Sequence, residues 1–337
     1  TATSNIGLGS NAVDSITTGD YNVGLGDDSG TAITSGQKNT LIGDGAGTAI
    51  TTGQSNTAVG HDSLKTLVTG NDVVAIGKGA LAVYTGSNAV AVGRNALTLN
   101  TTGADNTAVG HSALAATTTG ANNTAVGKSA LTANTTGQVN VAVGAYALDA
   151  NTTASSGVAI GYNALTANTT GGANIAIGKD ALEHNTTGTR NISIGYLALE
   201  ANTTAANNIA IGAEAMNDNT TGANNTAIGD SALSANTTGA QNTAMGTYAL
   251  NANTTAINNT AVGYKALYVN TTGADNTAFG REALWSNTTA TGNTALGFQS
   301  QNRTTTGANN TSVGYDSLYT NTTGANNVAV GKNALLV

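Results

Sequence analysis

Histidines are the residues of this chain best suited to proton transfer or metal binding, and there are three, His61, His111 and His184. The chain has no cysteine, so disulfides and thiolate metal sites are excluded. The repeat described below puts His61 and His111 on one edge, roughly 14 Å apart by strand spacing. That separation is too large for a shared metal or a proton relay. The histidines are therefore interpreted as surface residues.

Three aspartates form the one acidic group that the sequence singles out. Asp27, Asp28 and Asp44 fall at neighbouring places of consecutive repeats. Carboxylates stacked roughly 4.8 Å apart repel one another unless a cation or water screens them. Hard oxygen ligands suit Ca²⁺. The sequence therefore predicts either a Ca²⁺ site or a solvated acidic edge.

Aromatic side chains are few and lie unevenly along the chain. Six of them share two places of the repeat in the last quarter: Tyr264, Tyr268, Trp285, Phe298, Tyr315 and Tyr319. Exposed aromatic rings aligned along a surface could stack on sugar rings, and contiguous apolar surface marks binding sites. We expect a glycan-binding surface here. The alternative is that these rings cover coil edges or pack between chains.

No catalytic constellation accompanies these residues. The sequence has no nucleophile elbow and no phosphate-binding loop, and its glycines are not followed by a strand-to-helix pattern. A β-helical polysaccharide hydrolase would need paired carboxylates in a groove, whereas the acids are scattered. We expect a protein that is not an enzyme and uses no cofactor.

All these residues are positioned by a 17-residue repeat. Taking residues 225–241 as repeat positions 1 to 17 puts Gly229 at position 5. The same glycine recurs at Gly9, Gly26, Gly43, Gly60, Gly77, Gly93, Gly110, Gly127, Gly144, Gly161, Gly178, Gly195, Gly212, Gly246, Gly263, Gly280, Gly297, Gly314 and Gly331. A fixed short period is typical of a solenoid. The predicted fold is all-β, a parallel β-solenoid of about 20 coils. It is one domain over residues 1–337, with variant repeats in 1–92 and regular repeats in 93–337.

The residue types within the repeat predict a strand at positions 1 to 5. Position 2 is Thr, Val or Ile, and position 4 is aliphatic apart from Phe279. Alternate residues of a strand share one face, so positions 2 and 4 are expected to face the core. Leucine at position 9 is expected to face them. Positions 3 and 8 are Ala, Ser or Gly almost throughout. Such small residues predict a closely approaching backbone, either of a neighbouring chain or at a tight bend of the same chain.

Asparagine dominates positions 1 and 12 and should form ladders from coil to coil. Positions 12 to 15 read Asn-Thr-Thr-Gly, a turn with left-handed Asn and Gly. In early repeats Gly30 and Gly47 replace the leucine of position 9, while Ile33 and Ile50 occupy position 12, which indicates exchange of volume within one core. The repeat around Tyr84 is one residue short, and we expect a local irregularity there.

The charge balance limits the partners. The chain has 11 basic and 18 acidic residues and a net charge of −7, so there is no basic patch to neutralise phosphates and nucleic acid is not expected. No apolar run approaches the roughly 18 residues of a membrane span. The chain starts at Thr1 without a signal-like segment, and we expect a processed product or a segment of a longer chain.

The repeat also resembles known proteins. The segment NTAVGKSALTANTTG, residues 123–137, resembles the head repeats of trimeric autotransporter adhesins, and it is still more similar to repetitive shafts of bacterial and phage tail-fibre-domain proteins. The resemblance covers essentially the whole chain. It implies a left-handed β-roll with three chains side by side, located outside the cell, on the cell surface or on a virion, with binding as its task.

These observations predict a non-enzymatic fibre or adhesin segment that extends or displays a surface-binding region. Its expected partners are further copies of itself, as a trimer or a filament, and a cell-surface glycan. In the alternative function the chain is the subunit of an extracellular filament. Its uncapped solenoid ends would then stack end to end.

Overall fold

The computed structural model describes residues 4–336 and divides into two compact units, Thr1–Thr170 and Gly171–Val337. Both units are all-β, and residues 4–336 contain no helix. The first unit contains β1 (Ile6–Leu8), β2 (Val23–Leu25), β3 (Thr40–Ile42), β4 (Thr57–Val59), β5 (Val74–Ile76), β6 (Val90–Val92), β7 (Thr107–Val109), β8 (Thr124–Val126), β9 (Val141–Val143) and β10 (Val158–Ile160). The second contains β11 (Ile175–Ile177), β12 (Ile192–Ile194), β13 (Ile209–Ile211), β14 (Thr226–Ile228), β15 (Thr243–Met245), β16 (Thr260–Val262), β17 (Thr277–Phe279), β18 (Thr294–Leu296), β19 (Thr311–Val313) and β20 (Val328–Val330).

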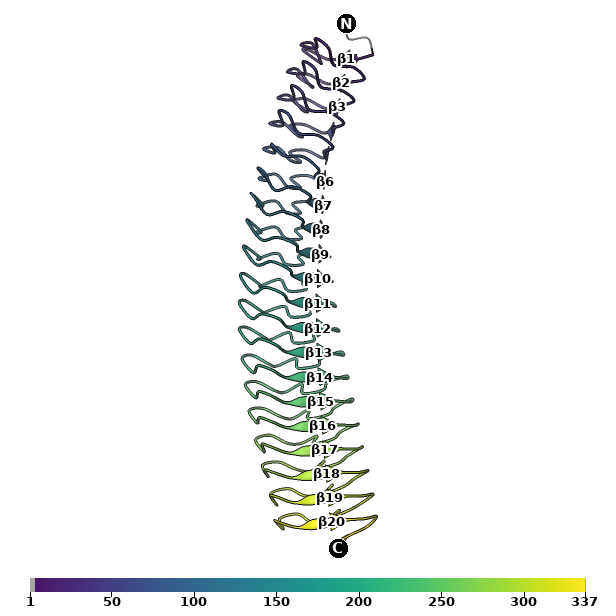
Figure 1. Cartoon of the computed structure of the whole chain (residues 1–337), viewed down its shortest axis with the longest axis vertical. Helices are drawn as coiled ribbons and strands as arrows, with labels where there is room; N and C mark the ends of the chain where they lie inside the picture. Colours follow the sequence, from purple (N-terminus) through teal and green to yellow (C-terminus); the bar gives the residue numbers. More distant parts are fainter. Residues whose placement is uncertain (1–3, 337) are drawn as a thin grey trace. The chain divides into compact units, whose positions relative to one another are not determined.

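Within each unit every strand pairs in parallel with the next strand along the chain (Figure 1). Thr226 of β14 pairs with Thr243 of β15, one repeat further on. Backbone bonds continue around the rest of the coil, for example from Leu233 N–H to the Ala249 carbonyl at 3.0 Å. The predicted parallel β-solenoid with a 17-residue period is confirmed. The strands cover positions 2 to 4 and are one residue shorter at each end than predicted.

The glycine of position 5 marks where one coil lies directly on the next. Gly229 has φ +132°, in the region that disfavours side chains, and a Cβ placed on it would lie 2.7 Å from the backbone carbon of Gly246. Any other residue at this position would have a strained backbone and would clash with the next coil. This contact explains why the glycine recurs once in every coil.

The predicted orientation of the strands is wrong. The Ala of position 3 is completely buried, as at Ala227, whereas positions 2 and 4 face outward. Ile160 at position 4 is 39% exposed and Phe279 is 53% exposed. Ile228 is only partly buried. The aliphatic side chains that were expected to form the core therefore lie on the outer face of the strand stack.

The reason is the narrow interior of the coil. Positions 3 and 8 lie against each other across it, as shown by Ser193, whose hydroxyl donates to the Ala198 carbonyl at 2.6 Å. Both residues are fully buried. Val or Ile does not fit in so small a gap. The small residues do meet a close backbone, but it belongs to the same coil, so the expected neighbouring chain at position 3 is wrong and the alternative within one chain holds.

The rest of the interior is built from leucine and asparagine, as predicted. Leu233 at position 9 is fully buried, and the asparagines at positions 1 and 12 are fully or almost fully buried except Asn5, Asn321 and Asn327, which are half-buried. Asn242 Nδ2 donates to Asn225 Oδ1 at 3.2 Å, and Asn253 Nδ2 donates to Asn236 Oδ1 at 2.9 Å, so both ladders run from coil to coil. Both ladders satisfy buried amides that would otherwise cost free energy.

The two ladders are joined within coils that have both asparagines. Asn242 and Asn253 both donate to the carbonyl of Ala256, at 2.8 and 3.2 Å. This shared carbonyl ties the strand to the turn that follows the leucine. The circuit of the coil is thereby closed by side-chain amides on its inner side.

The turn chemistry differs from the prediction. The left-handed residues of each coil are at positions 7, 9 and 17, for example Ser231, Leu233 at φ 55° and Gln241. A left-handed leucine costs roughly 1–2 kcal/mol, and its burial offsets this cost. The glycine of the Asn-Thr-Thr-Gly segment is not left-handed. It is needed because a side chain at this position would clash with the next coil. A Cβ on Gly239 would overlap the Ala256 carbonyl oxygen.

The expected exchange of volume in the early coils is confirmed. A Cβ on Gly47 would lie 2.7 Å from Leu41 Cδ2 and 2.9 Å from Ile50 Cδ1. A Cβ on Gly30 would be equally close to the side chains of Leu41 and Ile33. Leu41 thus stands at position 3 in place of alanine, and it fills the space left by the missing leucines of position 9.

The short repeat is accommodated in its turn without disturbing the strands. Val74 of β5 pairs with Val90 of β6, sixteen residues on, and Ala75 pairs with Ala91. Tyr84 occupies position 12, is completely buried, and donates its hydroxyl to the Ser87 carbonyl at 2.5 Å. One aromatic ring therefore takes the place of the asparagine of that coil.

Replacing Ala227 with Phe should destabilise the fold by about 3 kcal/mol or more, because the ring has no room between positions 3 and 8. Denaturant unfolding followed by circular dichroism measures the change. The matched control is Thr238→Phe in the same coil, at an exposed position, which should leave the midpoint nearly unchanged. Equal midpoints for the two variants would contradict the buried assignment of position 3.

Burial, and secondly the nearby Asp105, raise the pKa of Tyr84 to about 12. The folded state therefore keeps its phenol proton above pH 10, where the unfolded chain loses it. Stability linked to Tyr84 should be complete below about pH 10 and disappear between about pH 10 and 12. Denaturant midpoints across this range should fall less steeply in Tyr84→Phe than in the wild type. Identical slopes would contradict the linkage.

Candidate functional site

The outer face of the strand stack is a surface without charged side chains in each unit. In each unit it is formed by positions 2 and 4, and no position-4 side chain in residues 4–336 is buried. Those more than one third exposed are Leu8, Ile42, Ile76, Val109, Val126, Val143, Ile160, Met245, Phe279, Leu296 and Val330. We call this surface the strand face.

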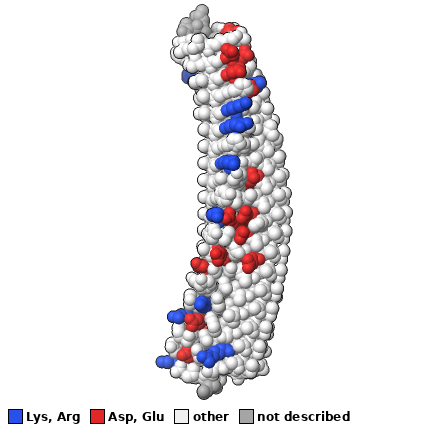
Figure 2. Space-filling view, turned by 180° about the vertical axis from the view of Figure 1, so that it is seen from behind, with Lys and Arg blue, Asp and Glu red and all other residues white. Residues whose placement is uncertain are grey.

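Charged residues are excluded from the strand face by the repeat itself. Every Lys, Arg, Asp and Glu falls at positions 6, 7, 10, 11, 16 or 17. On the face that Figure 2 shows, charged side chains lie beside broad uncharged surface. The strand face therefore presents only apolar and hydroxyl side chains.

The predicted aromatic residues form two rows in the second unit. In the row at position 6, the Arg281 guanidinium lies over the rings of Tyr264 and Phe298, at 5.8 and 5.6 Å. Phe298 stacks on Tyr315 with centroids 5.0 Å apart, and Lys332 lies over Tyr315. Cations and rings thus form a continuous stack from coil to coil.

The row at position 10 is built in a similar way. Tyr268 and Trp285 are stacked with centroids 6.3 Å apart and planes inclined by 7°. Lys265 lies over both Tyr264 and Tyr268, which connects this row to the first. Tyr319 is covered by Arg303 at 5.3 Å. All six predicted residues therefore contact another ring or a cation.

This stacking bears directly on sugar binding. A sugar ring stacks on the face of an aromatic ring, and in these rows the ring faces already contact neighbouring rings or cations. A sugar would compete with these contacts for the ring faces. The predicted glycan contact stays a prediction, and so does the alternative that the rings cover coil edges or pack between chains.

The structure gives each aspartate of the predicted Ca²⁺ group a different partner. Asp27 Oδ1 accepts from Ser10 N–H at 2.9 Å, and Asp28 Oδ1 accepts from Asn11 Nδ2 at 2.9 Å. Asp44 Oδ2 lies 3.6 Å from His61 Nε2. All three carboxylates are exposed. These contacts fit the solvated-edge alternative, and the Ca²⁺ prediction stays untested.

Another cluster was not predicted from the sequence. Glu183, His184 and Glu200 each offer one ligand atom, and these atoms lie within 4.8 Å of one another. It is the one such group of three in residues 4–336. The signal was present, because Glu183 and Glu200 are one repeat apart at position 10. Burial, then the nearby charge of Asp180, raises the pKa of Glu183.

No family model and no curated protein sequence matches the chain. The site must therefore be judged from its own geometry. Residues 4–336 enclose no pocket, and no helix of that range is long and apolar enough to cross a membrane. The candidate functional features are the strand face, the two aromatic rows and the cluster at Glu183.

Trp285 is the only tryptophan of the chain, so its fluorescence reports on the second aromatic row. Replacing Tyr268 with Ala should expose one face of the indole to water and shift its emission to longer wavelength. Tyr21→Ala, at an exposed tyrosine of the first unit, should leave the emission unchanged. An unshifted spectrum in Tyr268→Ala would contradict the stacked geometry.

Proposed function

We propose that this chain is a non-enzymatic structural segment of a fibre, and that its strand face packs against the strand faces of further copies of the same chain. The observation that carries the proposal is the outward row of aliphatic side chains at position 4. Val126 and Met245, for example, are 37% and 41% exposed in the single chain. Exposed apolar surface in a continuous stripe marks an interface.

The size of the strand face can be estimated from strand geometry. Ten strands about 4.8 Å apart make a face about 43 Å long, and positions 2 and 4 are about 7 Å apart along each strand. The projected area is then on the order of 300 Å² in each unit, which is no larger than the largest apolar patch of a typical monomer, about 300–600 Å². The proposal therefore depends on the continuous outward row of position 4 and not on the extent of the face.

The regularity of the face favours another copy over an unrelated partner. The same residue types recur at every strand spacing, and a second chain of the same repeat has the same spacing. Because no charged residue falls at positions 1 to 5, copies packed in register bring no like charges together. Two copies therefore match in spacing along the strand face of each unit.

The finer features of the proposal come from the family resemblance. Adhesin heads and tail-fibre shafts imply three chains side by side, a left-handed coil and a location outside the cell, on its surface or on a virion. The repeat supports the comparison through its Asn-Thr-Ala-Val-Gly core, as at residues 123–127. In such a fibre the aromatic rows would lie away from the joined strand faces, where a glycan is the proposed ligand.

Two outward substitutions test the proposal. Ile228→Asp combined with Val262→Asp places carboxylates on the strand face, where burial against another copy costs several kcal/mol. Sedimentation velocity should show a discrete homo-oligomer for the wild type and at least tenfold weaker association for the variant. The matched control, Thr238→Asp with Thr272→Asp, changes exposed residues of position 14 and should keep the oligomer.

Two results would contradict the proposal. One is a monomeric wild type at micromolar concentration, which would show that the strand face is free. The other is an oligomer of unchanged size in the Ile228→Asp, Val262→Asp variant. Open-ended polymers in both proteins would favour end-to-end stacking of solenoids instead.

A further inference from the structure

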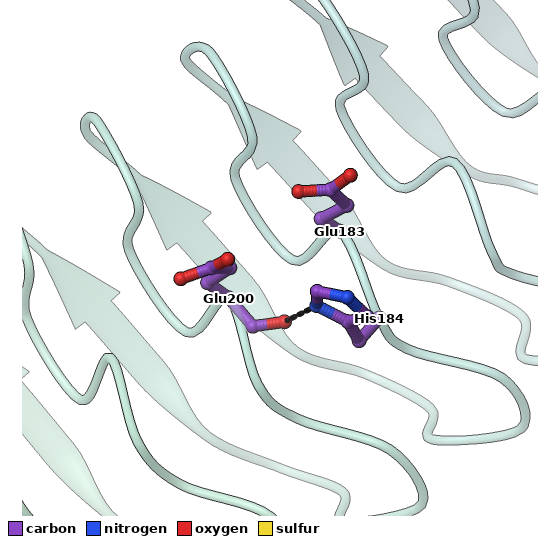
Figure 3. Close-up of side chains that lie close together, drawn as sticks. All are labelled: Glu183, His184 and Glu200. Atoms are coloured by element: carbon purple, nitrogen blue, oxygen red, sulfur yellow. Dashed lines mark hydrogen bonds between the residues drawn. The ribbon is translucent and has the colours of Figure 1, made fainter.

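The cluster of Glu183, His184 and Glu200 lies on two adjacent coils of the second unit, those that begin with β11 and β12. Glu183 and Glu200 occupy the same place of consecutive coils, so their side chains are neighbours, and His184 follows Glu183 directly (Figure 3). The two glutamates are half-buried and the histidine is exposed. The solenoid backbone therefore sets the spacing of all three side chains.

The histidine is held in one orientation by the next coil. The Glu200 carbonyl accepts the backbone N–H of His184 at 3.0 Å and lies 3.3 Å from its Nδ1 (Figure 3). A carbonyl oxygen can only accept, so Nδ1 is the protonated nitrogen in this contact. The lone pair of the neutral ring is then on Nε2, which is the arrangement found in metal-binding histidines whose other nitrogen donates to a carbonyl.

The second glutamate is also positioned. Glu200 Oε2 accepts from Asn217 Nδ2 at 2.9 Å, and the same amide donates to the Leu197 carbonyl at 3.1 Å. This hydrogen bond holds the Glu200 carboxylate in one orientation. It is a hydrogen bond to a carboxylate of the kind that orients metal ligands from outside the coordination sphere.

We propose that Glu183, His184 and Glu200 form a surface site for a zinc-class divalent cation. The ligand set of one imidazole nitrogen and two carboxylate oxygens is that of three-ligand zinc sites, which keep a fourth position for water. Ligand atoms of tetrahedral zinc lie about 3.4 Å apart. Rotation of the Glu183 side chain can reduce the 4.8 Å spread of the free cluster.

The electrostatics of the cluster favour a cation. Two carboxylates on adjacent coils repel each other, and Asp180 adds a third negative group while pairing with Lys179 at 3.4 Å. This crowding of negative groups is unfavourable without a cation. Bound zinc would relieve it. An imidazole ligand distinguishes such a site from one for Ca²⁺, which prefers oxygen ligands only.

His61 shows why a histidine beside carboxylates is not sufficient. Its Nε2 faces Asp44 and its Nδ1 faces Asp62, so the two carboxylates lie at different nitrogens of the ring. Asp62 is also paired with Lys65 at 2.9 Å. That group lacks the common ligand centre that the cluster at His184 possesses.

Titration calorimetry of the chelator-treated full chain with ZnCl₂ tests the site. We expect one Zn²⁺ per chain, binding at least tenfold weaker in His184→Ala and in Glu183→Gln, and no displacement by an equal concentration of Ca²⁺. His111→Ala is the matched control and should bind like the wild type. Thermal melting gives a second measurement, since Zn²⁺ should raise the Tm of the wild type but not of His184→Ala.

The proposal would be overturned by any of three results. These are no stoichiometric Zn²⁺ binding to the wild type, unchanged affinity in His184→Ala, or displacement of Zn²⁺ by equimolar Ca²⁺. Because the site lies within one chain, its stoichiometry per chain is independent of the number of copies in the fibre. Failure here leaves the proposed packing of the strand faces untouched.

Discussion

The regular stacking of one coil on the next governs every other feature of this protein. Backbone N–H and C=O groups of one coil pair with the same groups one repeat on, both in the strands and around the turns. Each residue type therefore lies directly over its counterpart in the adjacent coil. An interaction that suits one coil is multiplied along the stack, and an unsuitable one is multiplied equally, which is why the composition of each repeat position is so narrow.

The most consequential result of stacking is the thin interior. Positions 3 and 8 touch across the coil, so the only bulky core residue of a regular coil is the leucine of position 9. Buried asparagines supply the rest of the interior and satisfy one another from coil to coil. Where the pattern is broken, another residue restores the volume or the hydrogen bonds. Leu41 and Tyr84 restore volume, and Gln301, which stands in place of a leucine, donates to the Thr294 carbonyl at 2.9 Å.

Stacking also creates sites from isolated residues. Arg281 separates Tyr264 from Phe298 only because their coils are consecutive. Glu183 and Glu200 approach each other for the same reason. In a solenoid a residue has its functional neighbours one repeat away, so the useful spacing for finding sites is the period itself. The same rule places the aliphatic residues of position 4 in one stripe, on which the proposed packing of copies depends.

The sequence alone determined the fold class, the period, the asparagine ladders and the leucine of the core, because each is a property of residue types repeated in register. It also located the six aromatic residues that share two rows. The tertiary structure decided which strand face is inside. Alternation along a strand separates the residues of its two faces but does not show which face is buried. The bulky aliphatic residues of positions 2 and 4 suggested that their face forms the core. In the structure the opposite face is buried, because the coil is so narrow that only Ala, Ser or Gly fits opposite position 8 in a regular coil. The structure was likewise needed to place His184 beside two carboxylates. Contact between Glu183 and Glu200 depends on the direction in which their side chains leave the turn, and the sequence does not give that direction.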